Sequence, residues 1–151
     1  MESRARGLLE RLRSEIVVFD GAMGTMLFNA GLPPGACPEL WNADRPEAVQ
    51  AVHRAYVEAG SDMVETNSFG GSRLKLNEYG LGDRCRELNE KAARAARSVM
   101  PPGGLVAGSM GPTGKTLEPF GDTPVEEAYE SFREQAAALA EGGVDLLVIE
   151  T

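Results

Sequence analysis

Residues 16–27 read IVVFDGAMGTML, and this stretch indicates the fold more directly than any other. Four apolar residues, 16–19, are followed at once by a carboxylate, Asp20, and then by glycine and alanine. A compact apolar run of this kind, rich in β-branched residues, is typical of a strand buried on both faces of a parallel sheet. We therefore expect a strand that ends on Asp20, in a place where small residues let a ligand approach the backbone.

The same arrangement returns three times along the chain. The runs DMVET, LVAGS and DLLVIET begin near residues 62, 105 and 145, so the units are spaced by roughly 40 residues. An amphipathic segment precedes each run, and the helices expected from the apolar stripes cover about 46–59, 83–99 and 124–142. This alternation of strands and helices predicts an α/β fold built from parallel β/α units.

Two helix starts carry more specific expectations. Residues 1–15 are expected to form a short helix before the first strand, with Leu8, Leu9 and Leu12 on one face. Farther along, Asp44 is placed to cap the helix that begins near Pro46.

Two architectures are compatible with parallel β/α units: an open doubly wound sheet and a (β/α)8 barrel. A typical barrel needs roughly 250 residues, whereas this chain has 151. If the fold is a barrel, residues 1–151 form its N-terminal half as a single domain.

Polar residues stand where each strand is expected to end. These ends are Asp20-Gly21, Glu65-Thr66-Asn67, Ser109-Met110-Gly111 and Glu150-Thr151. In both architectures the carboxyl ends of the strands meet at one edge, where ligands bind. Two or three carboxylates that converge there would suit the ammonium group of an amino acid or a metal ion. The alternative for each one taken singly is that it only caps a turn or a helix.

The composition excludes several classes of partner. The net charge is −8, from 15 basic and 23 acidic residues, which disfavours nucleic acid and anionic membrane surfaces. No apolar run approaches the roughly 18 residues of a membrane span, and the N-terminus is too charged for a secretory signal. Two cysteines, Cys37 and Cys85, do not make a disulfide framework, so we expect a cytoplasmic protein.

At the strand ends the chain resembles a known family. The motifs that carry the resemblance are FDGAMGTML, CPELWN, RPEAVQAVHRAYVEAGSDMVETNSFGGSRLKL, VAGSMGPTGK and EGGVDLLVIET. In this order they resemble the homocysteine S-methyltransferases, and within them the homocysteine-binding module at the N-terminus of cobalamin-dependent methionine synthases. The resemblance covers nearly the whole chain and implies a (β/α)8 (TIM) barrel.

The resemblance also implies a reaction and a set of site residues. In the family, the sulfur of homocysteine attacks an activated methyl group and gives methionine. By correspondence of motifs, Asp20 and Glu150 lie near the homocysteine amino group, and Gly21 and Thr66 lie beside the substrate. A zinc ion held by three cysteines keeps the sulfur as thiolate, because a thiol that coordinates zinc is deprotonated.

The chain departs from the family pattern at the metal. The family's zinc cysteines lie on later strands, in the second half of the barrel, and Cys37, Cys85 and His53 lack metal-ligand spacing. We therefore expect zinc for the complete domain but no metal site in this chain, and we assign it no catalytic residue. Cobalamin and methyltetrahydrofolate, where they take part, would bind through other domains.

Two rival interpretations stay open. The chain can be a non-catalytic, truncated half-barrel or binding module that self-associates or pairs with a C-terminal half-barrel. It can also be an open-sheet protein that binds a phosphate ligand, because GSMGPTGKT resembles a phosphate-binding loop. That loop needs a glycine at position 109, however, and the chain has Ser109 there.

Overall fold

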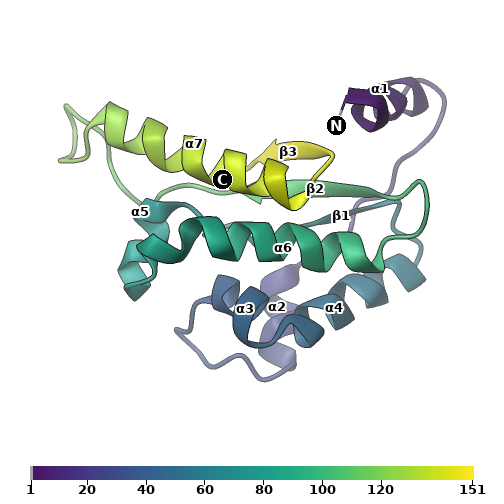
Figure 1. Ribbon diagram of the computed structural model, residues 1–151, viewed down its shortest axis with the longest axis horizontal. Coiled ribbons are helices and arrows are strands. Elements are labelled where there is room, and N and C mark those ends of the chain that lie inside the picture. Colours follow the sequence, from purple (N-terminus) through teal and green to yellow (C-terminus); the bar gives the residue numbers. More distant parts are fainter. Residues whose placement is uncertain (1) are drawn as a thin grey trace.

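A parallel three-stranded sheet organises the computed structural model, which describes residues 2–151, with side chains from residue 7 onward. The strands are β1 (Met63–Glu65), β2 (Leu105–Met110) and β3 (Leu146–Ile149), in the order β1-β2-β3 (Figure 1). Met63 lies opposite Leu105, and Ala107 lies opposite Leu146. The expected α/β fold with parallel strands is therefore confirmed.

Helices provide the crossovers between the strands. The α-helices are α1 (Glu2–Arg11), α2 (Met23–Asn29), α3 (Trp41–Asp44), α4 (Pro46–Glu58), α5 (Arg73–Leu76), α6 (Cys85–Val99) and α7 (Val125–Gly142). Short 3-10 turns cover Pro38–Leu40, Asn77–Tyr79 and Gly82–Arg84. The helices α6 and α7 lie side by side against one face of the sheet (Figure 1). None of the helices in the described part of the chain has the length and apolar character needed to cross a membrane.

Alternate side chains of the strands build two separate apolar clusters. On the helix side of the sheet, Val64 and Val106 pack with Leu139 of α7. On the opposite side, Met63 and Leu105 form a cluster with Leu8 of α1. Because successive strand residues point to opposite faces, β2 is covered on both sides and all six of its residues are buried.

The segment 16–19 pairs in parallel with β1 at Phe19, but the expected burial of this strand on both faces is wrong. Only Phe19 forms a bridge, to Met63, and the side chains of Ile16 and Val18 are 90% and 47% exposed. The segment runs beside β1 and has a neighbouring strand on that side only. Its apolar composition therefore does not lead to burial, because burial requires a covering layer on both faces.

The end of the first helix and the start of α4 also differ from expectation. The first helix ends at Arg11 rather than near residue 15, and Leu9 and Leu12 remain 65% and 54% exposed, so only Leu8 of the expected apolar face is buried. Asp44 closes the short helix α3 and does not cap α4. Pro46 begins α4 after Arg45 without a side-chain cap, since proline has no N–H that needs a partner.

Candidate functional site

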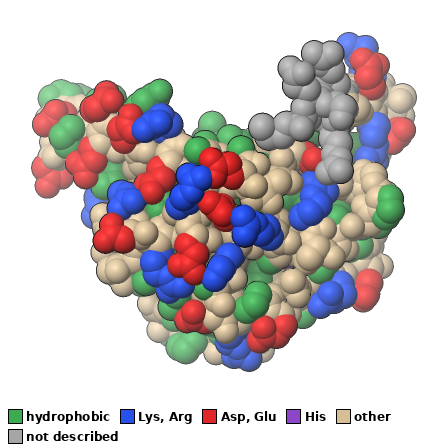
Figure 2. Space-filling model, in the orientation of Figure 1, with side chains coloured by type: hydrophobic (Ala, Val, Ile, Leu, Met, Phe, Trp, Pro, Cys, Tyr) green, Lys and Arg blue, Asp and Glu red, His purple; other side chains and the backbone are tan. Residues whose placement is uncertain are grey.

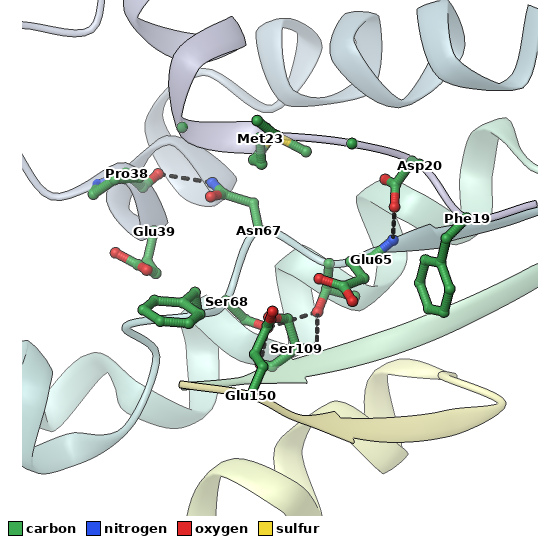
Figure 3. Close-up of a pocket in the computed structure, with 15 residues that line it drawn as sticks. Phe19, Asp20, Met23, Pro38, Glu39, Glu65, Asn67, Ser68, Ser109 and Glu150 are labelled. Carbon is green, nitrogen blue, oxygen red and sulfur yellow. Dashed lines mark hydrogen bonds between the residues drawn. The ribbon is translucent and has the colours of Figure 1, made fainter. Parts of the chain in front are cut away.

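A cavity of about 530 Å³ opens at the carboxyl ends of the strands (Figure 3). Its polar lining comprises Asp20, Glu39, Glu65, Thr66, Asn67, Ser68, Ser109 and Glu150, and its apolar lining includes Phe19, Ala22, Met23, Pro38 and Phe69. The structure thus brings Asp20, Gly21, Thr66 and Glu150 together around one pocket. Their role in binding a substrate stays a prediction.

Side chains extend the strand pairing at this edge of the sheet. Asp20 Oδ1 accepts a hydrogen bond from the backbone N–H of Glu65 at 3.0 Å. Thr66 Oγ1 accepts one in the same way from the backbone N–H of Ser109 at 3.0 Å. In a parallel ladder a backbone carbonyl normally accepts this bond. A side-chain oxygen that replaces it lets the main chain turn away from the sheet and form the pocket wall.

Gly21 allows two segments to approach closely. A Cβ atom at this position would lie 3.0 Å from Oη of Tyr56 on α4. The Tyr56 hydroxyl donates a hydrogen bond to the carbonyl oxygen of Ala22 at 3.1 Å. The absence of a side chain at Gly21 therefore lets α4 hold the loop that leads into α2 and that lines the pocket.

Three carboxylates face the pocket: Asp20 after the segment 16–19, Glu65 at the end of β1 and Glu150 after β3. Burial raises the pKa of Asp20 to about 6, and the charge of Glu150 adds to the rise. The pKa of Glu65 rises to about 7, first through burial and then through the charge of Glu150 and a hydrogen bond with it. The hydroxyl of Ser109 donates a hydrogen bond to Glu150 Oε1 (Figure 3).

No positive side chain balances these carboxylates. Among the described residues that line the pocket there is no Lys, Arg or His. Asp20 and Glu65 therefore either keep protons as the pH approaches neutrality or are balanced by a cation from outside the described pocket residues. An ammonium group provides both the charge and several hydrogen-bond donors.

Sequence reasoning missed a fourth carboxylate, Glu39. It is only 5% exposed, and its Oε1 accepts a hydrogen bond from the backbone N–H of Gly70 at 2.7 Å. The thiol of Cys37 donates to its other oxygen at 3.1 Å. The motif CPELWN predicts a loop, but nothing in its spacing indicates that the glutamate turns inward. Glu65, by contrast, stands at a strand end, where its position pointed to the pocket.

The described residues do not fit a zinc site. Burial raises the pKa of Cys37 and of Cys85 to about 12, whereas zinc binds thiolates. The Cys85 thiol donates to the carbonyl oxygen of Gly71 at 3.2 Å. His53 is fully buried on α4, and burial lowers its pKa to about 4. Within the described chain no group of three His, Cys, Asp or Glu residues is arranged to hold a metal ion.

Comparison with known proteins identifies the family of the chain. The family model for homocysteine S-methyltransferase matches residues 17–151. The chain belongs to the homocysteine S-methyltransferase family. Among curated members, the methionine synthases of Mycobacterium tuberculosis and Mycobacterium leprae are 38% and 37% identical over 156 residues. The match covers 95% of the chain but 13% of either synthase, so this homocysteine S-methyltransferase chain spans a small part of those relatives.

Solved structures of the family share the fold. The metallated form of the homocysteine methyltransferase MmuM from Escherichia coli superposes with a TM-score of 0.76 at 28% identity. The oxidised form of that enzyme gives a TM-score of 0.75 at 29% identity. The superposition on the metallated form covers 98% of the chain and 57% of MmuM. The three-stranded sheet and its helices are thus similar to a little over half of a homocysteine methyltransferase.

Proposed function

We propose that residues 1–151 form the N-terminal half of a homocysteine S-methyltransferase (β/α)8 barrel and bind the amino-acid end of homocysteine. The substrate's sulfur would then accept a methyl group to give methionine. Membership of the family and the shared fold support this role. A second half-barrel would complete the sheet and hold the zinc ion. Any cobalamin or methyltetrahydrofolate would bind through other domains. The protein would act in the cytoplasm.

The observation that carries the proposal is the set of pocket carboxylates that no cation among the described lining residues balances. Asp20 and Glu150 would hold the substrate ammonium, while the Gly21 backbone and Thr66 would shape the pocket beside it. Asp20 and Glu65 have pKa values of about 6 and about 7, so both retain protons in weakly acidic solution. Because an ammonium ion favours the ionised carboxylates, homocysteine would displace protons and bind more tightly as the pH rises from about 5 to 8.

Pairing with a second half-barrel is supported by the exposed edge of β3. The side chains of Leu147 and Ile149 are 41% and 85% exposed, although both belong to a strand of the sheet. Within the described chain, β3 pairs only with β2. An additional strand along β3 would satisfy its free backbone groups, and the layer that accompanies this strand would cover these apolar side chains on the face of the sheet.

Calorimetry with L-homocysteine tests the proposal, together with zinc analysis, on the 151-residue chain and on a version extended to the full barrel. We expect the extended protein to hold zinc and to bind homocysteine. Asp20→Asn and Glu150→Gln should each weaken binding about ten-fold, the loss of one charged hydrogen bond. Glu58→Gln, an exposed carboxylate on α4, is the matched control and should leave the affinity unchanged.

An analogue separates the ammonium site from the rest of the pocket. The compound 4-mercaptobutyrate keeps the thiol and carboxylate of homocysteine and lacks its amino group. Its affinity should not fall in Asp20→Asn or Glu150→Gln, because it has no ammonium for these residues to hold. Equal losses for both compounds would show that the two carboxylates maintain the fold and do not bind the amino group.

A further inference from the structure

The loop between β2 and α7 projects from the body of the molecule and exposes a large aromatic side chain. Leu117 bridges to Thr123, and the Phe120 N–H donates to the Leu117 carbonyl oxygen at 3.1 Å, so the loop has an ordered turn. Phe120 nevertheless has 92% of its surface exposed. The backbone of the loop is thus held in place while its largest apolar side chain remains in solvent.

The apolar surface continues onto the first turns of α7. Val125 and Tyr129 are 60% and 59% exposed, and a spacing of four residues places them on one face of the helix. Together with Leu117 and Phe120 they form what we call the β2–α7 surface, residues 117–129. Exposed apolar groups gathered in this way mark sites of protein association.

Acidic residues surround this apolar group. Glu118, Asp122, Glu126 and Glu127 are all exposed, and no Lys or Arg occurs between residues 116 and 132. None of the four makes an ion pair with another described residue, whereas Glu87 on α6 is paired with both Arg84 and Lys91. Figure 2 shows hydrophobic and acidic side chains gathered on the projecting lobe where, in Figure 1, the loop meets α7.

We infer that the β2–α7 surface docks a protein partner that presents Lys and Arg side chains around an apolar centre. The acidic border repels nucleic acid and anionic lipid, and the apolar centre needs a partner that can bury it. Charge complementarity of this kind favours encounter and orientation in protein complexes.

The position of the β2–α7 surface determines where a docked partner would lie relative to the pocket. The loop begins at the carboxyl end of β2, where the Gly111 N–H donates to the carbonyl oxygen of Phe69 at 2.9 Å. Phe69 lines the pocket. A docked protein would therefore lie at the same edge of the sheet as the pocket opening. The inference rests on the exposed side chains and does not depend on homocysteine binding.

The test measures, by fluorescence anisotropy, how tightly a synthetic amphipathic helix of leucine and lysine binds to the 151-residue chain. We expect binding that weakens as salt is added. Phe120→Ser combined with Val125→Ser should weaken probe binding about ten-fold, because the leucine face of the probe then loses two apolar side chains that it would contact. Leu9→Ser combined with Leu12→Ser removes two exposed apolar side chains from α1 and the turn that follows it, and should have no effect.

A second pair of variants tests the charges. Glu118→Gln combined with Asp122→Asn should weaken binding and reduce its salt dependence. Glu47→Gln combined with Glu58→Gln removes the same charge from α4 and should leave binding unchanged. Equal losses in both pairs would overturn the inference, because they would show attraction to the net charge of the whole chain.

Two further outcomes also overturn the inference. If the probe binds the 151-residue chain but not a version extended to the full barrel, the surface is covered within the barrel. If Phe120→Ser instead abolishes self-association in analytical ultracentrifugation, the occupant is a second copy of the chain. Homocysteine calorimetry on Phe120→Ser should match the unsubstituted protein, so failure here is distinguishable from failure of the proposed function.

Discussion

The two ends of the sheet use the same carboxylate arrangement for different purposes. At the amino ends of the strands, Asp145 donates its N–H to the carbonyl oxygen of Val106 at 2.8 Å and accepts the N–H of Val106 at 2.9 Å. Asp62 makes the same two bonds with Val18, each at 2.9 Å. Asp145 pairs with Arg97. Both aspartates at this end therefore extend the strand pairing.

The difference between the ends lies in the cation. Asp62 pairs with Arg11 at 3.1 Å, so each aspartate at the amino end has an arginine from the chain. Asp20, at the carboxyl end, also accepts a backbone N–H from the neighbouring strand, but no basic residue is among the described residues that line its pocket. Where the chain supplies the cation the arrangement stabilises the fold, and where it does not a ligand can supply it.

The largest effect is expected for Asp145→Ala, which removes the best-buried of these carboxylates. The Asp145 residue is 5% exposed, and its loss leaves Arg97 and the N–H of Val106 without this partner. We expect the free energy of unfolding in urea to fall by about 3 kcal/mol. Asp145→Asn keeps an acceptor for Val106 and should lose less. A change below about 1 kcal/mol would mean that the carboxylate contributes little to stability.

A smaller loss is expected for Asp62→Ala, since this side chain is 34% exposed. Removal of the acceptor for the N–H of Val18 should cost about 1 kcal/mol. The hydrogen bond from Val18, and then Arg11, holds the pKa of Asp62 below its ordinary value. Its stabilisation is therefore present above an ordinary aspartate pKa and is lost as the pH falls further. Urea unfolding of both proteins between pH 2 and pH 6 would show this if the two curves converge in acid.

A lysine placed in the pocket would make the two ends alike. Met23 and Asp20 line the same pocket (Figure 3), so Met23→Lys would bring an ammonium group into the pocket that holds this carboxylate. We expect a gain of about 0.5 kcal/mol at pH 7 and weaker homocysteine binding, because the new cation competes for the same oxygens. Phe28→Lys, an exposed position on the same helix, should change neither quantity. Thermal melts and calorimetry measure the two effects.

The pH dependence expected at the carboxyl end of the sheet is opposite in sign to that of Asp62. The pKa values of Asp20 and Glu65 are raised to about 6 and about 7, so between about pH 4 and 7 the folded chain holds protons that the unfolded chain has released. Stability from these groups therefore falls as the pH rises through this window. Asp20→Asn combined with Glu65→Gln should flatten the slope of thermal stability between pH 5 and 8. An unchanged slope would mean that other groups cause the pH dependence of stability.

The sequence predicted the layout of the sheet well because the apolar runs are separated by helices of clear amphipathic pattern. The run 105–110 is buried throughout, and the similar run 16–19 is mostly exposed. The exposed run, IVVF, is the more apolar of the two, since residues 105–110 read LVAGSM. Burial therefore follows the number of neighbouring elements, which no local pattern of residues records. The same reason explains why Leu9 and Leu12 are exposed although they were expected to lie with Leu8 in an apolar face.

The site could be predicted to the extent that it is built from strand ends. Asp20, Thr66 and Glu150 meet at one pocket because parallel strands bring their carboxyl ends to one edge. Glu39 enters the same pocket from a loop, and loop paths follow from tertiary contacts such as the hydrogen bond from Gly70. The raised pKa of Glu65 likewise depends first on its burial and then on the nearby Glu150, and the sequence contains neither the burial nor the distance.

The packing of α1 determines when this helix can find its place during folding. Leu8 contacts a cluster formed by Met63 and Leu105, residues that come together only after β1 and β2 have paired across a long crossover. A helix of ten residues is too short to persist alone in water. Helix α1 therefore becomes stable only once these later parts of the chain have paired and built its docking surface.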